Sequence, residues 1–223
     1  MKAGKTKEVP AAQSTLSFSG KIAYVKGAFD SIQTLITEMG IPVTALNLED
    51  AQDFNKLKQY DVLLLNCNSE FFDYGNDRIL ERFLQEGRSI YASDWEIEKL
   101  SAQDFGFIPE NLLSYDYAGV EEITEGNILF EPFKKALGKS KISIDFNLSG
   151  YVRITQLTRN DDRFKVLVDH PQKGPLAVSI QWGPTHLSPL EIPTGGKIIY
   201  TTFHDAKLSA DVKLVLQQTI LQF

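Results

Sequence analysis

Four short polar segments each follow directly on an apolar run, and together they hold most of the side chains that can perform chemistry. They are Gly27-Ala28-Phe29, Cys67-Asn68-Ser69-Glu70, Ser93-Asp94-Trp95 and His204-Asp205. If the apolar runs are neighbouring parallel strands, the segments meet at the carboxyl edge of one sheet, where open α/β sheets bind their ligands. We therefore expect a functional site at this edge, with a pocket lined by Gly27, Cys67, Asn68 and Trp95.

Motifs for a metal ion or a nucleotide cofactor are absent. A metal site needs three or four converging ligands, and the local histidine–carboxylate pairs, Asp169-His170 and His204-Asp205, lack the i, i+4 spacing that places both groups on one helix face. Neither Gly-x-Gly-x-x-Gly nor Gly-x4-Gly-Lys-Ser/Thr occurs. The sequence therefore predicts no metal and no cofactor.

Composition limits the expected partners and compartment. Lys and Arg total 23 against 29 Asp and Glu, a formal net charge of -6, which argues against a general binder of nucleic-acid backbones. No stretch reaches the ~18 consecutive apolar residues of a transmembrane helix. Cys67 is the single cysteine, so an intrachain disulfide and a thiolate metal cluster are both excluded. We expect a cytoplasmic protein whose partner is a protein or a small molecule, not nucleic acid or a membrane.

The elements that position the polar segments alternate between strand and helix in the first half of the chain. Apolar or β-rich runs predict strands at 21–26, 42–47, 61–66 and 89–93. Apolar residues at helical spacing predict helices at 29–39, 48–60 and 77–86, the last with Asp77 as its cap. Four strands joined by three helices predict a parallel, doubly wound α/β sheet with a flavodoxin-like core.

The second half of the chain is richer in strands. Strand-like runs dominate from 115 to 182 around one helix at 130–137, and a further strand follows at 196–203 before a closing helix capped by Ser209. We expect residues 1–18 to form a flexible basic tail. Residues 19–223 then form a single α/β domain that carries a β-rich antiparallel insertion at about 112–194.

Three stretches of the sequence resemble class I glutamine amidotransferases. GGKIIYTTFHDA is similar to the late segment of that superfamily in which a histidine follows a buried strand, and GRSIYASDW stands at its strand-to-helix turn. YDVLLLNC completes the likeness to an uncharacterised bacterial group of this class. The resemblance implies that Ser93 occupies the place of the nucleophilic cysteine and His204 the place of the base, with Asp94 or Asp205 orienting the histidine.

The sequence departs from the superfamily's pattern around this turn. Tyr91 and Trp95 stand where glycines flank the nucleophile, and Ala206 stands where the orienting acid is expected. Bulky neighbours crowd a strained nucleophile turn, and an unoriented imidazole is a poor base. We therefore expect a non-catalytic amidotransferase-like domain that binds a partner protein or a small ligand. The alternative is a serine hydrolase of amide or peptide bonds that uses Ser93 and His204.

Each candidate also has a structural interpretation. Ser93 or Asp94 can cap the helix that follows, with Glu96 three residues later as in a capping box. Cys67 at the end of a buried strand can be a small apolar filler. His204 can simply bond a neighbouring loop, while His170 and His186 stand near prolines and are expected in surface loops.

The segment from Asn68 to Arg78 contains Phe71, Phe72 and Tyr74. Exposed aromatic side chains anchor protein interfaces, so this loop is a candidate lid or partner-docking surface. The alternative is that the three rings pack under the loop against the β-rich insertion.

Overall fold

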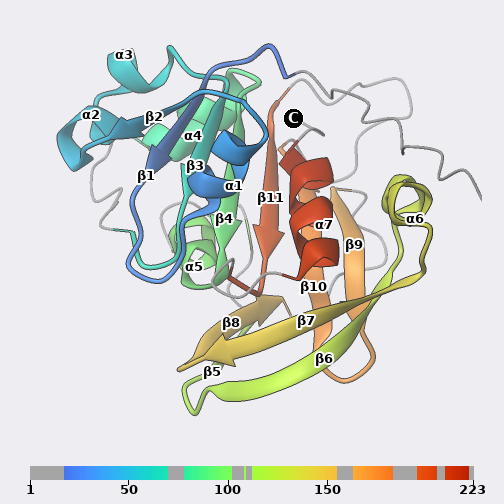
Figure 1. Ribbon diagram of the computed structural model, residues 1–223. Coiled ribbons are helices and arrows are strands. Elements are labelled where there is room, and N and C mark those ends of the chain that lie inside the picture. Colours follow the sequence, from blue (N-terminus) through green and yellow to red (C-terminus); the bar gives the residue numbers. More distant parts are fainter. Residues whose placement is uncertain are drawn as a thin grey trace, which may run out of the picture.

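The computed structural model describes residues 18–69, 78–101, 108, 112–154, 163–182, 195–204 and 209–220. Within these residues, nine strands form one sheet in the order β2-β1-β3-β4-β11-β10-β9-β6-β7, and β5 pairs separately with β8 (Figure 1). The fold is the α/β, mostly parallel flavodoxin-like arrangement that the sequence predicts. The expected basic tail lies outside the described residues, apart from Phe18.

Five parallel strands form the half of the sheet that carries the polar segments. They are β1 (Ile22–Val25), β2 (Val43–Leu46), β3 (Val62–Leu65), β4 (Ser89–Ser93) and β11 (Lys197–Thr201). Their register sets the last residues of neighbouring strands side by side, since Val25 pairs with Leu65 and Thr201 pairs with Ser93. The segments that leave these strands therefore start from one common edge.

Helices cover both faces of this parallel half (Figure 1). They are α1 (Ile32–Glu38), α2 (Leu48–Gln52), α3 (Phe54–Leu57), α4 (Ile79–Gln85), the 3-10 helix η1 (Asp94–Glu96), α5 (Ile97–Ser101) and α7 (Ala210–Ile220). Alternate residues of β3 explain the two layers: Leu63 and Leu65 pack with α3, α4 and α5, whereas Val62 and Leu64 pack with α1 and α7. An unbroken apolar strand is what burial on both faces requires.

One predicted helix is wrong in the structure, and the start of another cannot be compared with it. The helix expected at 48–60 is broken at Asp53, whose extended backbone ends α2 while its side chain accepts from the Asn55 N–H to start α3. A short polar side chain that competes for backbone donors favours such a cap over a continuous helix. Asp77, the expected cap of α4, lies outside the described residues.

Most of the β-rich segment continues the nine-stranded sheet, while its strands β5 and β8 pair with each other in a separate two-stranded sheet. Its strands are β5 (Leu113–Asp116), β6 (Val120–Ile128), β7 (Lys141–Leu148), β8 (Tyr151–Ile154), β9 (Phe164–His170) and β10 (Gly174–Gln181), with helix α6 (Glu131–Leu137) between β6 and β7. Strand β10 pairs antiparallel with β11, and β9, β6 and β7 follow outward. Strand β8 packs against η1, which brings the β-rich segment to the turn after β4.

The closing helix begins as predicted. The Ser209 hydroxyl accepts a hydrogen bond from the Val212 N–H at 3.2 Å, which caps α7. None of the helices in the described part of the chain is long and apolar enough to cross a membrane.

Candidate functional site

The loops after β1 and β3 pack closely at the carboxyl edge of the sheet. A Cβ atom at Gly27 would lie 2.4 Å from the carbonyl oxygen of Cys67, so only glycine fits this approach. The same oxygen accepts hydrogen bonds from the N–H groups of Ala28 (3.1 Å) and Phe29 (3.4 Å). Gly27 therefore fixes the two loops to each other at the floor of the site.

The strained residue at the turn after β4 is Asp94, not Ser93. Asp94 has φ +48°, in the left-handed region that side chains other than Gly, Asn and Asp rarely adopt. Ser93 keeps the extended backbone of a strand, with φ -114° and ψ 135°. Since a nucleophile elbow places its reactive residue on the strained position, the turn here presents a carboxylate rather than a hydroxyl.

Ser93 is fully buried and serves neither as a side-chain cap nor as a partner of His204. Its residue stands at the N-cap position of η1, but its side chain makes no cap hydrogen bond. The hydroxyl instead donates a hydrogen bond to Asp30 Oδ2, while Asp30 Oδ1 accepts from the Cys67 N–H at 2.8 Å. Asp30, which the sequence did not single out, thus joins the loops after β1 and β3 to the end of β4.

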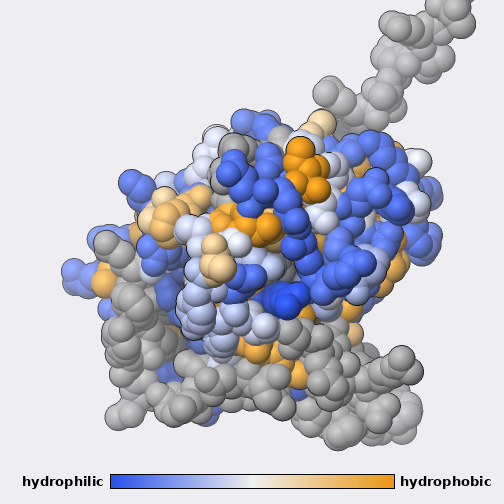
Figure 2. Space-filling view, turned by 90° about the horizontal axis from the view of Figure 1, so that it is seen from below, coloured by the Kyte–Doolittle hydropathy of each residue, from blue (hydrophilic) through white to orange (hydrophobic). Residues whose placement is uncertain are grey.

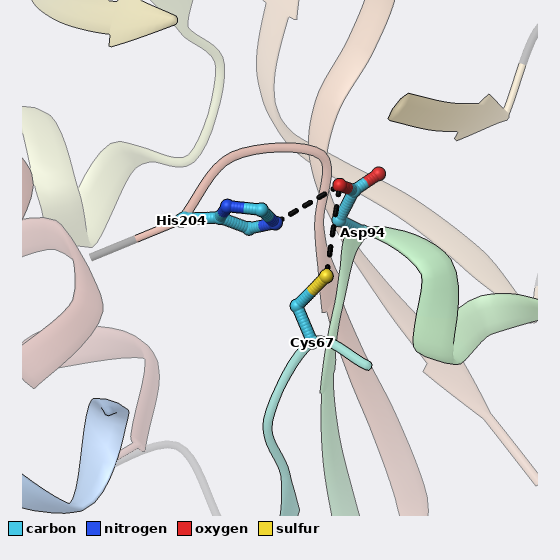
Figure 3. Close-up of side chains that lie close together, drawn as sticks. All are labelled: Cys67, Asp94 and His204. Atoms are coloured by element: carbon cyan, nitrogen blue, oxygen red, sulfur yellow. Dashed lines mark hydrogen bonds and ion pairs between the residues drawn. The ribbon is translucent and has the colours of Figure 1, made fainter. Parts of the chain in front are cut away.

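Three side chains that lie far apart in the sequence come together at the carboxyl edge of the sheet: those of Cys67, Asp94 and His204 (Figure 3). His204 Nε2 lies 2.9 Å from Asp94 Oδ2, and Cys67 Sγ lies 3.8 Å from the same oxygen. Asp94 Oδ1 accepts a hydrogen bond from the Val152 N–H of β8 at 2.7 Å. The His204 ring also stacks on Phe29, with the ring planes 3° apart and the centroids separated by 6.4 Å.

The contact between His204 and Asp94 is close but not a regular hydrogen bond. The two atoms are near enough for an ion pair when the imidazole is protonated. Buried Nε2 makes no hydrogen bond within the described part of the chain. The His204 side chain is itself nine-tenths buried, with 10% of its surface exposed.

Burial controls the protonation of the acidic groups in this cluster. It raises the pKa of the Asp94 carboxyl, although the approach of His204 and the Val152 N–H opposes the shift. Burial and the charge of Asp94 also raise the pKa of the Cys67 thiol. The thiol therefore stays protonated at neutral pH and donates to Asp94, and a protonated, fully buried thiol is a poor nucleophile.

A second buried carboxylate, Glu96, anchors the loop after β3. Its two oxygens accept from the Ser69 N–H (2.8 Å) and the Ser69 hydroxyl (2.7 Å). Lys99 Nζ lies 2.8 Å from Glu96 Oε2 and also donates to the Ser69 carbonyl at 2.7 Å. This network holds Asn68, which itself has a left-handed backbone with φ +56°, in a fixed position above the sheet.

Two cavities open over the carboxyl edge, and Asn68 lines both of them. The larger, of about 560 Å³, lies over the ends of β1 and β2 and includes Gly27 in its wall. The smaller, of about 280 Å³, we call the aromatic hollow; it is lined by Phe29, Asn68, Trp95, Tyr117, Ser149 and Gly150. Of the expected pocket residues, Gly27, Asn68 and Trp95 line a cavity, whereas Cys67 is fully buried.

The rings of the aromatic hollow contact one another and the backbone of Gly150, and two of them are exposed to solvent. Trp95 Nε1 donates to the Gly150 carbonyl at 3.3 Å, and its ring lies 5.7 Å from that of Tyr117. Tyr117 in turn stacks with Tyr115 at an interplanar angle of 9°. Phe29 and Tyr117 are 53% and 75% exposed. Figure 2 shows this end of the molecule, where apolar side chains form separate patches among hydrophilic ones.

Several predicted residues lie outside the described part of the chain. Asp205, the alternative orienting acid, is one of them, as are the three aromatic residues of the predicted docking loop, Phe71, Phe72 and Tyr74. His186 is another. His170 ends β9, where its Nε2 lies 2.9 Å from the Thr124 hydroxyl and its Nδ1 accepts from the Lys173 N–H at 3.0 Å.

Comparison with known proteins finds similarity at the level of structure. No family model matches the chain, and a search of curated proteins finds no match. The N-terminal domain of mmIFT52 superposes with a TM-score of 0.57 at 12% identity, covering 91% of this chain and 95% of that one. A Thermoplasma acidophilum protein described as a GMP synthase component gives 0.56 at 15% identity, covering 91% and 92%.

A ThuA-like protein of Parabacteroides merdae is similar to the same degree, with a TM-score of 0.57 at 13% identity over 88% of this chain and 86% of that one. At such identities the likeness shows the fold and does not transfer an activity. The chain therefore shares its α/β fold with these three proteins.

Proposed function

We propose that this chain is a non-catalytic amidotransferase-like domain that binds a small ligand in the aromatic hollow. One observation carries the proposal: the reactive side chains at the turn are fully buried and engaged with one another, while the rings above them are open. Ser93, Asp94 and Cys67 have no exposed surface. A ligand that enters the hollow therefore meets rings and an amide rather than a nucleophile.

The serine hydrolase alternative lacks its central contact. A serine nucleophile needs a base within hydrogen-bond reach of its hydroxyl. The Ser93 hydroxyl donates to Asp30, and His204 faces Asp94 instead. Binding is therefore the better supported of the two functions.

The lining of the hollow indicates the ligand's chemistry. Trp95 and Tyr117 offer ring faces that gain energy from stacking, and Asn68 offers an amide that can both donate and accept hydrogen bonds. Aromatic walls with a few convergent polar groups are typical of small-molecule sites. We expect a small ligand with a planar ring and polar substituents, and a partner protein would have to insert a side chain of the same kind.

Saturation-transfer NMR tests this proposal with three probes: adenosine and indole, which carry planar rings, and methyl glucoside, which does not. We expect saturable transfer to adenosine or indole that exceeds the transfer to methyl glucoside. Tyr117→Ala and Trp95→Ala should abolish it. Ile123→Ala is the matched control because Ile123 is equally exposed, at 73%, but lies on β6 away from the hollow.

The outcomes are separable. Transfer that survives in both Tyr117→Ala and Trp95→Ala, or that is lost in Ile123→Ala, would contradict binding in the hollow. No transfer to either planar probe at millimolar concentration would also count against the proposed ligand class.

A further inference from the structure

We propose that Cys67, Asp94 and His204 form a binding site for a divalent transition-metal ion, with Zn²⁺ as the preferred ion. The site lies under the aromatic hollow and does not depend on what the hollow binds. Each residue offers one ligand atom, and Sγ, Oδ2 and Nε2 all lie within 4.8 Å of one another. The sequence alone predicts no metal site, because residues 67, 94 and 204 belong to three segments that lie far apart in the chain.

Two of the three distances between these atoms are close to those that a tetrahedral ion needs. Zn–S bonds of about 2.3 Å and Zn–N or Zn–O bonds of about 2.0 Å give sulfur–oxygen and nitrogen–oxygen separations of roughly 3.5 and 3.3 Å. The structure has 3.8 Å from Cys67 Sγ to Asp94 Oδ2 and 2.9 Å from His204 Nε2 to the same oxygen. For these two pairs, an ion requires that His204 move slightly away from Asp94 Oδ2 and that Cys67 move closer to it.

His204 provides an independent indication of a missing ligand. Its Nε2 is buried and makes no hydrogen bond among the described residues, although it lies 2.9 Å from Asp94 Oδ2 and the ring points at the other two ligand atoms (Figure 3). A buried polar atom without a partner costs free energy, so native structures normally satisfy it. An ion bound to Nε2, Oδ2 and Sγ would satisfy this nitrogen.

The surrounding contacts are those expected around a metal ligand set. The Val152 N–H holds the second oxygen of Asp94, which leaves Oδ2 for the ion. The Phe29 ring lies parallel to the imidazole. Such outer contacts orient the ligands themselves and strengthen metal binding.

The chemistry of the donors selects the ion. One thiolate, one imidazole and one carboxylate suit Zn²⁺, whereas Mg²⁺ and Ca²⁺ prefer oxygen ligands throughout. Binding displaces the Cys67 thiol proton to solvent, so that the site holds a thiolate, a carboxylate and a neutral imidazole around the ion. Three protein ligands leave one tetrahedral position for water or for a ligand atom.

Titration of the metal-free protein with Co²⁺, followed by competition with Zn²⁺, tests the site. Thiolate-bound tetrahedral Co²⁺ gives a charge-transfer band in the near ultraviolet and d–d bands in the visible. We expect both sets of bands to saturate at one equivalent and to disappear when Zn²⁺ is added. Cys67→Ser should remove the charge-transfer band, and His204→Gln should weaken Co²⁺ affinity by at least about 100-fold.

His170→Gln is the control, because His170 is bonded to Thr124 and Lys173 on a different strand pair. It should bind Co²⁺ as the unaltered protein does. Absence of the charge-transfer band in the unaltered protein would overturn the proposal, whatever the stability of the variants. Equal Co²⁺ affinity in His204→Gln, or loss of binding in His170→Gln, would overturn it as well.

Discussion

The buried pair of Glu96 and Lys99 gives the sharpest test of how the loop above the sheet is held. The Glu96 side chain is 1% exposed, and Lys99 is the cation beside it. Lys99→Met would leave the carboxylate with two Ser69 donors but no opposite charge. Removing one partner of a buried ion pair costs about 3–5 kcal/mol, and we expect about 3 kcal/mol here because the Ser69 donors remain.

Urea unfolding followed by circular dichroism measures this loss. With a slope of about 2 kcal/mol per molar urea, a change of about 3 kcal/mol lowers the midpoint by roughly 1.5 M. Lys141→Met is the matched control, since Lys141 pairs with Glu125 on the exposed hairpin of β6 and β7 and should lose less than about 1 kcal/mol. Glu96→Gln combined with Lys99→Met should recover much of the loss, because a neutral amide needs no cation.

The loss of unfolding free energy in Lys99→Met should also depend on pH. Burial raises the pKa of Glu96 and Lys99 opposes that shift, so its removal raises the Glu96 pKa further. A carboxyl whose pKa is higher in the folded than in the unfolded state becomes more destabilising as pH rises through that range. The difference in unfolding free energy between Lys99→Met and the unaltered protein should therefore become smaller as pH falls toward the ordinary pKa of glutamate. A midpoint shift no larger than that of Lys141→Met, or no recovery in the double variant, would refute the reasoning.

Three further substitutions test the contacts that build the site, each by urea unfolding. Gly27→Ala places a Cβ 2.4 Å from the Cys67 carbonyl oxygen and should cost about 1–3 kcal/mol; an unchanged midpoint would show that the loops are free to separate. Tyr200→Phe removes the buried hydroxyl that donates to the Val152 carbonyl and should cost about 1–3 kcal/mol, so a neutral result would mean that β8 is not tied to β11 in this way. Asp30→Ala leaves the Cys67 N–H and the Ser93 hydroxyl without their acceptor and should cost more than Asp30→Asn, which keeps one acceptor oxygen; equal losses in the two variants would contradict the bridging role.

The parallel half of the fold follows from local patterns in the sequence. The unbroken apolar run that ends at Leu65 is buried on both faces as β3, and the polar segment after it reaches the carboxyl edge beside those of β1 and β4. A strand's burial pattern repeats within a few residues, so a short window of sequence carries it. The Ser209 cap was predictable for the same reason.

The identity of the strained residue was not predictable in this way. The sequence predicts a strand that ends at Ser93, as β4 does, but Ser93 and Asp94 are both polar and both close to Trp95, so the pattern cannot say which of them adopts the left-handed backbone. Register decides the matter, since Thr201 of β11 pairs with Ser93 and extends β4 to that residue. A shift of one residue reverses which side chain faces the core, so the turn presents Asp94.

The hydrogen bonds between distant residues of the site could not be predicted from the sequence either. Asp30 bonds the Cys67 N–H, Glu96 bonds Ser69 and Val152 bonds Asp94, each across 27 to 58 residues of chain. Their only local signal was a carboxylate near a helix start, which the sequence offers at many positions. Tertiary packing alone distinguishes a buried acceptor from a solvated cap.

Labelling with a serine-reactive fluorophosphonate, read by peptide mass spectrometry, tests most directly whether the buried turn is non-catalytic. We expect no modification of Ser93 in the folded protein, because its hydroxyl is buried and donates to Asp30. Modification of Ser93 that disappears in His204→Ala would contradict it and establish a serine nucleophile with a histidine base.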